Sequence, residues 1–96
     1  MGITSASAVT AVGYRALTAH TTGGGATAVG YNALAANTTG NQNTAVGNQT
    51  LSQVDSGTYN VGLGSYAGYQ TTGSSNTVVG YQALFASGSG SNNTMV

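Results

Sequence analysis

One stretch decides the fold of this chain: residues 27–43, which read TAVGYNALAANTTGNQN and run directly into Thr44-Ala45-Val46-Gly47. The opening tetrapeptide Thr27-Ala28-Val29-Gly30 therefore returns unchanged after a single unit. β-Branched residues and glycine that recur at a fixed interval of this length are typical of proteins built from stacked coils. The unit predicts the architecture of the whole chain, because related units precede and follow it.

Six copies of this unit occupy nearly the whole chain. Their third residues fall at positions 12, 29, 46, 63, 79 and 96, so every step is 17 residues except the step of 16 from 63 to 79. Glycine keeps the same interval at positions 23, 40, 57, 73 and 90. We expect the residue missing from the short step to lie between Leu63 and Gly73, in a polar stretch where length changes are tolerated. The coils are centred on Val12, Val29, Val46, Leu63, Val79 and Val96.

The composition restricts the chain to one domain, residues 1–96, with almost no charge. It has one basic residue, one acidic residue and one histidine among 96 residues. Disordered segments combine low hydrophobicity with high charge, whereas apolar residues recur here in register. The lack of charge removes the electrostatic footprint needed for nucleic acid or an anionic membrane surface. No apolar run approaches the roughly 20 residues of a membrane span, so we expect neither nucleic acid binding nor membrane insertion.

The repeat favours strands over helices. Apolar positions do not recur at intervals of three and four, and each of the 16 glycines would cost about 1 kcal/mol in a helix interior. We predict a short strand around each Thr-Ala-Val, closed by a glycine with positive φ. Parallel strands about 4.8 Å apart then give a rod of about 24 Å from Val12 to Val96. The predicted fold is an all-β, single-chain parallel β-solenoid, or β-roll.

Alternation along a strand predicts which columns face the interior. We predict that the Val column, with Val12 and Val46 among its members, points inward, and that the Thr column two residues earlier shares this face. The column of Leu17 then closes the other side of the core. The intervening Ala column faces outward, yet it is also apolar. Strands that are apolar on both faces are usually buried on both faces, so we expect a second copy of the chain to cover this one.

The candidates for catalysis are few. His20 and Asp55 lie two coils apart in the repeat register, about 10 Å at the spacing of stacked strands, whereas proton transfer needs about 2.6–3.2 Å. One His and one Asp also supply too few metal ligands within one chain, and only a trimer with His20 on its axis would gather more. The string GLGSYA at residues 62–67 matches a dinucleotide fingerprint but lacks its βαβ unit and acidic residue. We therefore expect no enzyme activity and no catalytic, cofactor-binding or metal-binding residues.

Other side chains repeat down columns. Tyr14, Tyr31 and Tyr81 share one column, and stacked tyrosines either bind sugar or pack against a neighbouring chain, with packing the favoured interpretation. Asn32, Gln49 and Gln82 share another column, in which amide side chains can form ladders along the stack. The formal N-glycosylation sequons begin at Asn37, Asn48 and Asn92.

The repeats resemble those of a known group of fibrous proteins. Asn43-Thr44-Ala45-Val46-Gly47 and residues 76–84, which read NTVVGYQAL, are similar to repeats in trimeric autotransporter adhesin heads and related bacteriophage tail-fibre proteins. The resemblance covers about residues 8 to 96. It implies a left-handed parallel β-roll, three chains packed about a fibre axis, and a role in surface attachment. The coil here is longer than in that family, and no coiled-coil stalk or membrane anchor is visible.

Two functions follow as hypotheses. The first is a structural or adhesive fibre segment on a cell surface or virion, which assembles with itself as a trimer or an end-to-end filament and contacts a cell-surface glycan or another receptor. The second is ice binding, because low charge and regular threonines also resemble ice-binding β-rolls. Ice binding needs outward threonines, and the predicted inward Thr column disfavours it.

Overall fold

The computed structural model describes residues 8–19, 23–85 and 90–96, and the fold over these residues is all-β. Six short strands form one sheet in the order β1-β2-β3-β4-β5-β6, with no helix among the described residues. Their bounds are β1 Thr10–Val12, β2 Thr27–Val29, β3 Thr44–Val46, β4 Val61–Leu63, β5 Thr77–Val79 and β6 Thr94–Met95. Each strand coincides with a Thr-Ala-Val position of the repeat, as predicted.

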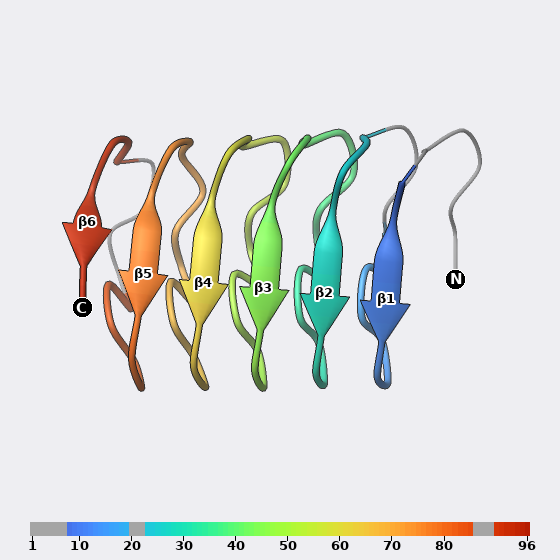
Figure 1. The fold of residues 1–96 in the computed structure, drawn as a ribbon, viewed down its shortest axis with the longest axis horizontal. Helices are drawn as coiled ribbons and strands as arrows, with labels where there is room; N and C mark the ends of the chain where they lie inside the picture. Colours follow the sequence, from blue (N-terminus) through green and yellow to red (C-terminus); the bar gives the residue numbers. More distant parts are fainter. Residues whose placement is uncertain (1–7, 20–22, 86–89) are drawn as a thin grey trace.

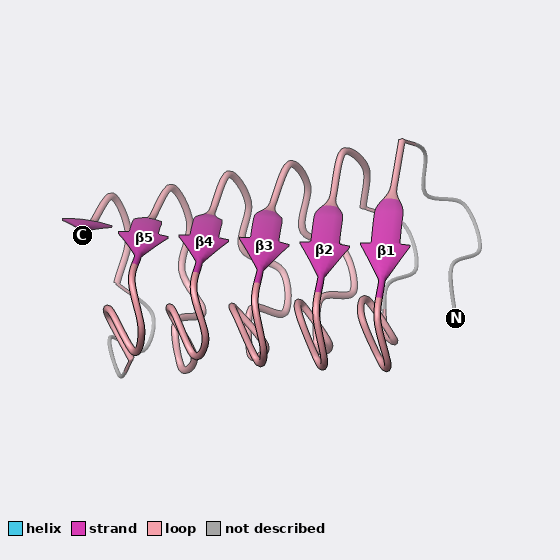
Figure 2. Ribbon diagram, turned by 60° about the horizontal axis from the view of Figure 1, so that its bottom comes forward, coloured by secondary structure: helices cyan, strands magenta, loops and turns pink. Residues whose placement is uncertain are grey.

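The strands stack in parallel, one coil upon the next (Figure 1). Thr10 pairs with Thr27 and Thr27 with Thr44, so each coil is 17 residues long in this part of the stack. Val61 pairs with Thr77, which places the short coil where the sequence predicts it. After each strand the chain turns back behind the sheet and returns to the start of the next strand (Figure 2). The predicted parallel β-solenoid of about 17-residue coils is confirmed.

Glycine ends each strand for two reasons. Gly30 follows β2 with a φ of 130°, in the region that L side chains rarely adopt. A Cβ atom on Gly30 would also lie 2.5 Å from the carbonyl oxygen of Gly47 in the next coil. The coils therefore touch backbone to backbone at this corner. The predicted strand-ending glycines with positive φ are confirmed, and they are Gly13, Gly30, Gly47, Gly64 and Gly80.

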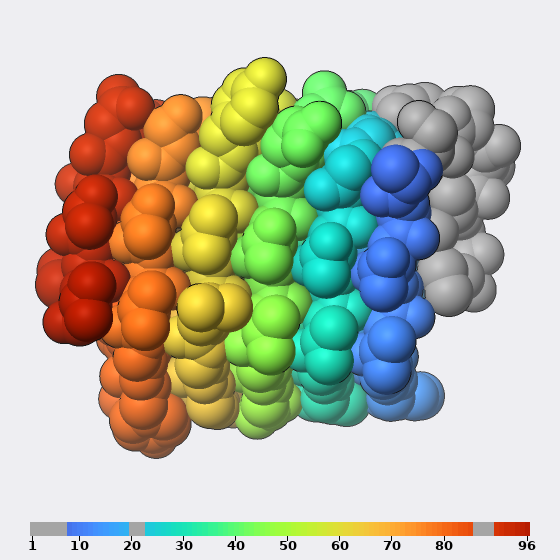
Figure 3. Space-filling view, in the orientation of Figure 1, coloured from blue at the N-terminus to red at the C-terminus, as the bar shows by residue number. Residues whose placement is uncertain are grey.

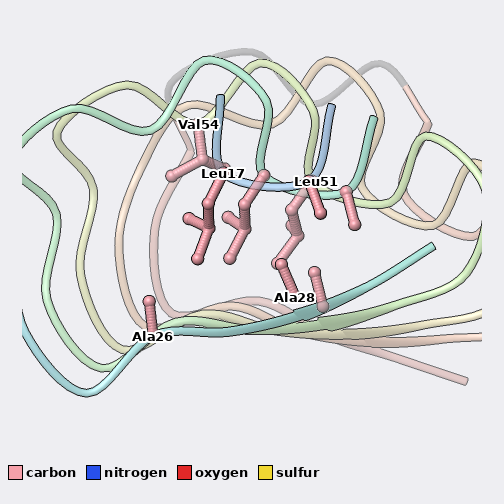
Figure 4. Close-up of a cluster of buried hydrophobic side chains, with 9 residues drawn as sticks. Leu17, Ala26, Ala28, Leu51 and Val54 are labelled. Atoms are coloured by element: carbon pink, nitrogen blue, oxygen red, sulfur yellow. The ribbon is translucent and has the colours of Figure 1, made fainter. Parts of the chain in front are cut away.

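The core lies between the sheet and the returning segments. Leu17, Leu34 and Leu51 are fully buried, which confirms the predicted role of the Leu column. Leu17 and Leu51 point from the returning segments toward the sheet, where Ala28 lies opposite (Figure 4). Each of these leucines has a positive φ, between 50° and 53°. The local backbone strain at these positions is offset by burial of a large aliphatic side chain.

The predicted orientation of the strands was wrong. Ala28 and Ala45 are fully buried, whereas Val12 is 56% exposed and Val46 39% exposed. The Ala column therefore faces the core, and the Thr and Val columns both face outward. The reason is space, because a Cβ atom on Gly62 of the same inward column would lie 2.9 Å from Cγ of Leu51. Leucines fill the thin interior and leave room only for small residues opposite them.

Candidate functional site

The outward face of the sheet is the candidate functional surface, and we call it the Thr–Val face. It consists of the outward side chains of β1 to β6 and runs the length of the stack (Figure 3). No pocket occurs in the part of the chain that the structure describes. Its two columns are Thr10, Thr27, Thr44, Val61, Thr77 and Thr94, and Val12, Val29, Val46, Leu63, Val79 and Val96.

The Thr–Val face exposes a column of aliphatic side chains. Val12, Val46, Leu63 and Val96 are all exposed. The face has no charged residue, because Arg15 and Asp55 both lie outside the strands. A row of exposed aliphatic side chains without interspersed charge makes this face the candidate for contact with another surface.

A buried asparagine ladder holds the C-terminal coils in register. The Oδ1 atom of Asn43 accepts a hydrogen bond from the backbone N–H of Asn60 at 2.9 Å, and Oδ1 of Asn60 accepts one from Asn76 at 3.0 Å. The Nδ2 atoms of the same residues donate to the carbonyl oxygens of Gly57 and Gly73. Asn76 repeats both interactions, with the backbone N–H of Asn93 and the carbonyl of Gly90. The ladder makes the scaffold behind the Thr–Val face specific in register, since buried amides require their partners.

The asparagine ladder replaces the amide column that the sequence suggested. Asn32, Gln49 and Gln82 form no such ladder among the described residues, and Oδ1 of Asn32 is buried without a partner. The residues that do form one directly precede the strands, at 43, 60, 76 and 93. Sequence reasoning missed them, although an asparagine before every strand from β3 onward was a visible signal.

A tyrosine column follows the strands at one corner of the coil. Tyr14 and Tyr31 are stacked, with ring centroids 5.6 Å apart and an interplanar angle of 8°. Tyr14 and Tyr81 are 70% and 71% exposed, and Tyr31 is 45% exposed. Asn48 and Ser65 occupy the column between Tyr31 and Tyr81, so only the first two rings touch.

A second aromatic cluster lies at the short coil. Tyr69 packs against Tyr66 and Phe85, with centroid distances of 5.2 Å and 4.9 Å. All three residues are half-buried. Gly68 occupies the Leu column in this coil, and a Cβ atom there would lie 2.7 Å from Cδ2 of Leu51. The aromatic cluster links this coil to the next one through Phe85, and the sequence reasoning did not identify it.

Of the two residues considered for acid–base chemistry, only Asp55 lies within the described residues. Asp55 is exposed, and its Oδ1 atom accepts a hydrogen bond from Oγ1 of Thr38 at 2.6 Å. His20 lies outside the described residues. Within the described ranges, no group of three or more His, Cys, Asp or Glu residues could hold a metal ion. Residues 62–67 begin in β4 and continue into a turn rather than a helix, so they do not form a dinucleotide site.

The three sequons differ in how far their asparagines are exposed. The side chain of Asn37 is fully buried, so it is closed to modification in the folded chain. Asn48 and Asn92 are exposed. In none of the described segments is there a helix with the length and apolar character needed to cross a membrane.

Comparisons with protein-family models, with curated proteins and with solved structures found no match.

Proposed function

We propose that this chain is a non-enzymatic structural segment of a fibre, in which copies of the chain meet through the Thr–Val face. The observation that carries the proposal is the exposed aliphatic column Val12, Val46 and Leu63 on a flat, uncharged sheet. A solenoid whose described residues form no pocket offers surface and stiffness. The fibre hypothesis accounts for both properties.

The expected cover for this face is another copy of the chain. We predicted that the Ala column faces the second copy, whereas the Thr and Val columns are the ones that face outward. A sheet whose outward and inward columns are both apolar is usually buried on both sides. A chain almost without charge has little to repel an identical copy.

The size of the face favours a trimer over a pair. Six strands about 4.8 Å apart, each three residues of about 3.3 Å, give a plan area of about 300 Å². A standard interface needs about 800 Å² per partner, so one face-to-face contact is too small. A closed trimer, in which every chain contacts two neighbours, or a longer end-to-end filament also buries surface at the flanks or the open ends of the coils, beyond the Thr–Val face. We propose a homotrimer or such a filament as the assembled state.

The proposed setting is an extracellular appendage or a virion. A fibre there contacts its target through repeated exposed side chains, and the tyrosine column supplies aromatic rings for a neutral glycan. Binding of the assembled protein to a glycan array, compared between the wild type and Tyr81→Ala, tests this adhesive role. Glycan binding that is unchanged by Tyr81→Ala would show that the tyrosine column does not contribute to adhesion.

Sedimentation equilibrium tests the assembly. We expect the wild type to sediment as a trimer or larger, and Val46→Asp to dissociate because it places a carboxylate in the apolar contact. Gln53→Asp is the matched control, since Gln53 is exposed but lies outside the strands. A wild-type chain that remains a folded monomer at high concentration would contradict the proposal.

Ice binding is the second candidate, and one observation now favours it. The sequence disfavoured it because the Thr column was predicted to face inward, whereas Thr10, Thr77 and Thr94 are exposed and Thr27 and Thr44 are half-buried on the outward face. One face cannot be covered by other copies and bind ice at the same time. Thermal hysteresis that is abolished by Thr44→Tyr would support ice binding, and its absence at millimolar concentration would reject it.

A further inference from the structure

We propose that Tyr14 and Tyr31 are a site of oxidative cross-linking, at which a covalent bond joins two neighbouring coils of the stack. The two rings are parallel within 8°, their centroids are 5.6 Å apart, and both residues are exposed. They lie one repeat apart in adjacent coils, so folding brings them together although 16 residues separate them in the sequence. This inference does not rest on the proposed function, because the pair lies within one chain.

This pair is unlike the other exposed tyrosines of the described chain. Tyr81 has Ser65 before it in its column, and Tyr59 has Gln42 and Ser75 as its column neighbours. Tyr66 and Tyr69 do touch, but they are half-buried, meet at 61°, and belong to one coil. Only Tyr14 and Tyr31 combine exposure with an aromatic partner in the adjacent coil.

The chain lacks two kinds of side chain that normally compete with tyrosine for an oxidant. The sequence contains no cysteine and no tryptophan. Methionine occurs at the two ends of the chain, as Met1 and Met95. A tyrosyl radical formed on Tyr14 therefore has Tyr31 as its nearest oxidisable neighbour among the described side chains.

The step balances with a haem peroxidase and hydrogen peroxide as the oxidant. Each phenol loses one electron and one proton, and the peroxide is reduced to two molecules of water. The two tyrosyl radicals couple through the ring carbons next to their hydroxyl groups. Loss of the hydrogens on those carbons to the phenolic oxygens restores both aromatic rings. The product is a dityrosine whose formation needs only rotation of two exposed side chains.

Arg15 makes the cross-link directly measurable. It is the only Lys or Arg of the chain and lies between the two tyrosines, so trypsin cuts the unfolded chain once and separates residues 1–15 from 16–96. Tyr14 is the only tyrosine of the shorter fragment. The experiment treats dilute folded protein with peroxidase and limiting peroxide, isolates single chains under denaturing conditions, digests them with trypsin, and weighs the products.

We expect the two fragments to stay joined in one product that shows two N-termini, Met1 and Ala16, on sequencing. The two N-termini distinguish it from an uncut chain with one added oxygen atom, which has the same mass. The linked product should be lost in Tyr31→Phe, retained in Tyr81→Phe, and lost when oxidation is carried out on the unfolded wild type. Separation of the fragments in the oxidised folded wild type, or a linked product that persists in Tyr31→Phe, would overturn the proposal.

Discussion

The N-terminal and C-terminal halves of the solenoid share one backbone but differ in their interior chemistry. The first three coils contain a continuous aliphatic cluster that includes Leu17, Leu34 and Leu51. From the third coil onward the asparagine ladder runs through Asn43, Asn60 and Asn76. In the second coil, Ala26 occupies the position that corresponds to Asn43 of the ladder. The repeated coil of this chain therefore accepts either non-directional apolar packing or directional hydrogen bonds behind the same outward face.

The two kinds of interior differ in what they specify. Apolar burial stabilises a coil roughly in proportion to area but tolerates small shifts in register. Each amide of the ladder must find one backbone N–H and one glycine carbonyl, so a slipped coil would leave buried polar groups unpaired. The ladder spans the irregular step in which Asn60 and Asn76 are only 16 residues apart. We interpret it as the element that keeps register across the short coil.

The largest expected effect comes from the aliphatic half. Leu34→Ala removes a fully buried side chain from the centre of the cluster, and we expect it to lower the free energy of unfolding by about 2–5 kcal/mol. Leu84→Ala is the matched substitution in the other half, where the leucine is only half-buried. Urea denaturation at a fixed protein concentration measures both. Equal losses at the two positions would contradict the distinction between the halves.

Breaking the ladder should cost somewhat less. Asn60→Ala leaves the carbonyl of Gly73 and the backbone N–H of Asn76 without their side-chain partners, and each buried unsatisfied group costs about 1–3 kcal/mol. We expect a loss of about 2–4 kcal/mol, with faster amide hydrogen exchange at Asn76 as the local signature. Gln42→Ala, at an exposed position before the same ladder begins, serves as the control. A loss below that of the control would show that the ladder contributes nothing to stability.

Extending the ladder into the first half tests whether the two interiors are interchangeable. In Ala26→Asn the new amide would occupy the ladder column, next to the backbone of Asn43 and Gly40, and we expect stability to change by no more than about 1 kcal/mol because new hydrogen bonds offset crowding. Ala45→Asn instead places an amide in the inward strand column opposite the leucines. There we expect a loss of about 2–3 kcal/mol from an unpaired buried amide. Thermal melts that show the same loss for both variants would contradict this account.

The smallest effect is expected at the surface. Asp55→Ala removes the hydrogen bond from Thr38, which lies on the exposed side of the coil. Exposed interactions of charged groups contribute about 0–1 kcal/mol. We expect a change of less than about 1 kcal/mol at neutral pH in the same urea titration. A larger loss would mean that the polar turns, and not the interior, hold the coils together.

The sequence was sufficient for the position of the strands, the turns that follow them and the leucine core. The period places every strand, glycines mark the turns after β1 to β5, and Leu17, Leu34 and Leu51 occupy the core as predicted. The orientation of the strands was predicted wrongly because Ala45 and Val46 are both apolar, and hydrophobicity alone does not choose between them. The choice depends on the room opposite the leucines, which is a property of the folded coil. The ladder was missed for a related reason, because a buried asparagine is recognisable only once the carbonyl that accepts its hydrogen bond is placed.

The central claim is that Ala45 points into the core while Val46 lies on the face where copies meet. The chain has no cysteine of its own, so the rate of thiol labelling in Ala45→Cys and Val46→Cys tests it directly. We expect the thiol at position 45 to be protected at every protein concentration. We expect the thiol at position 46 to react rapidly in dilute protein and to be protected when the chains assemble. A thiol at 45 that reacts as fast as the one at 46, or a thiol at 46 whose reactivity is unaffected by concentration, would contradict it.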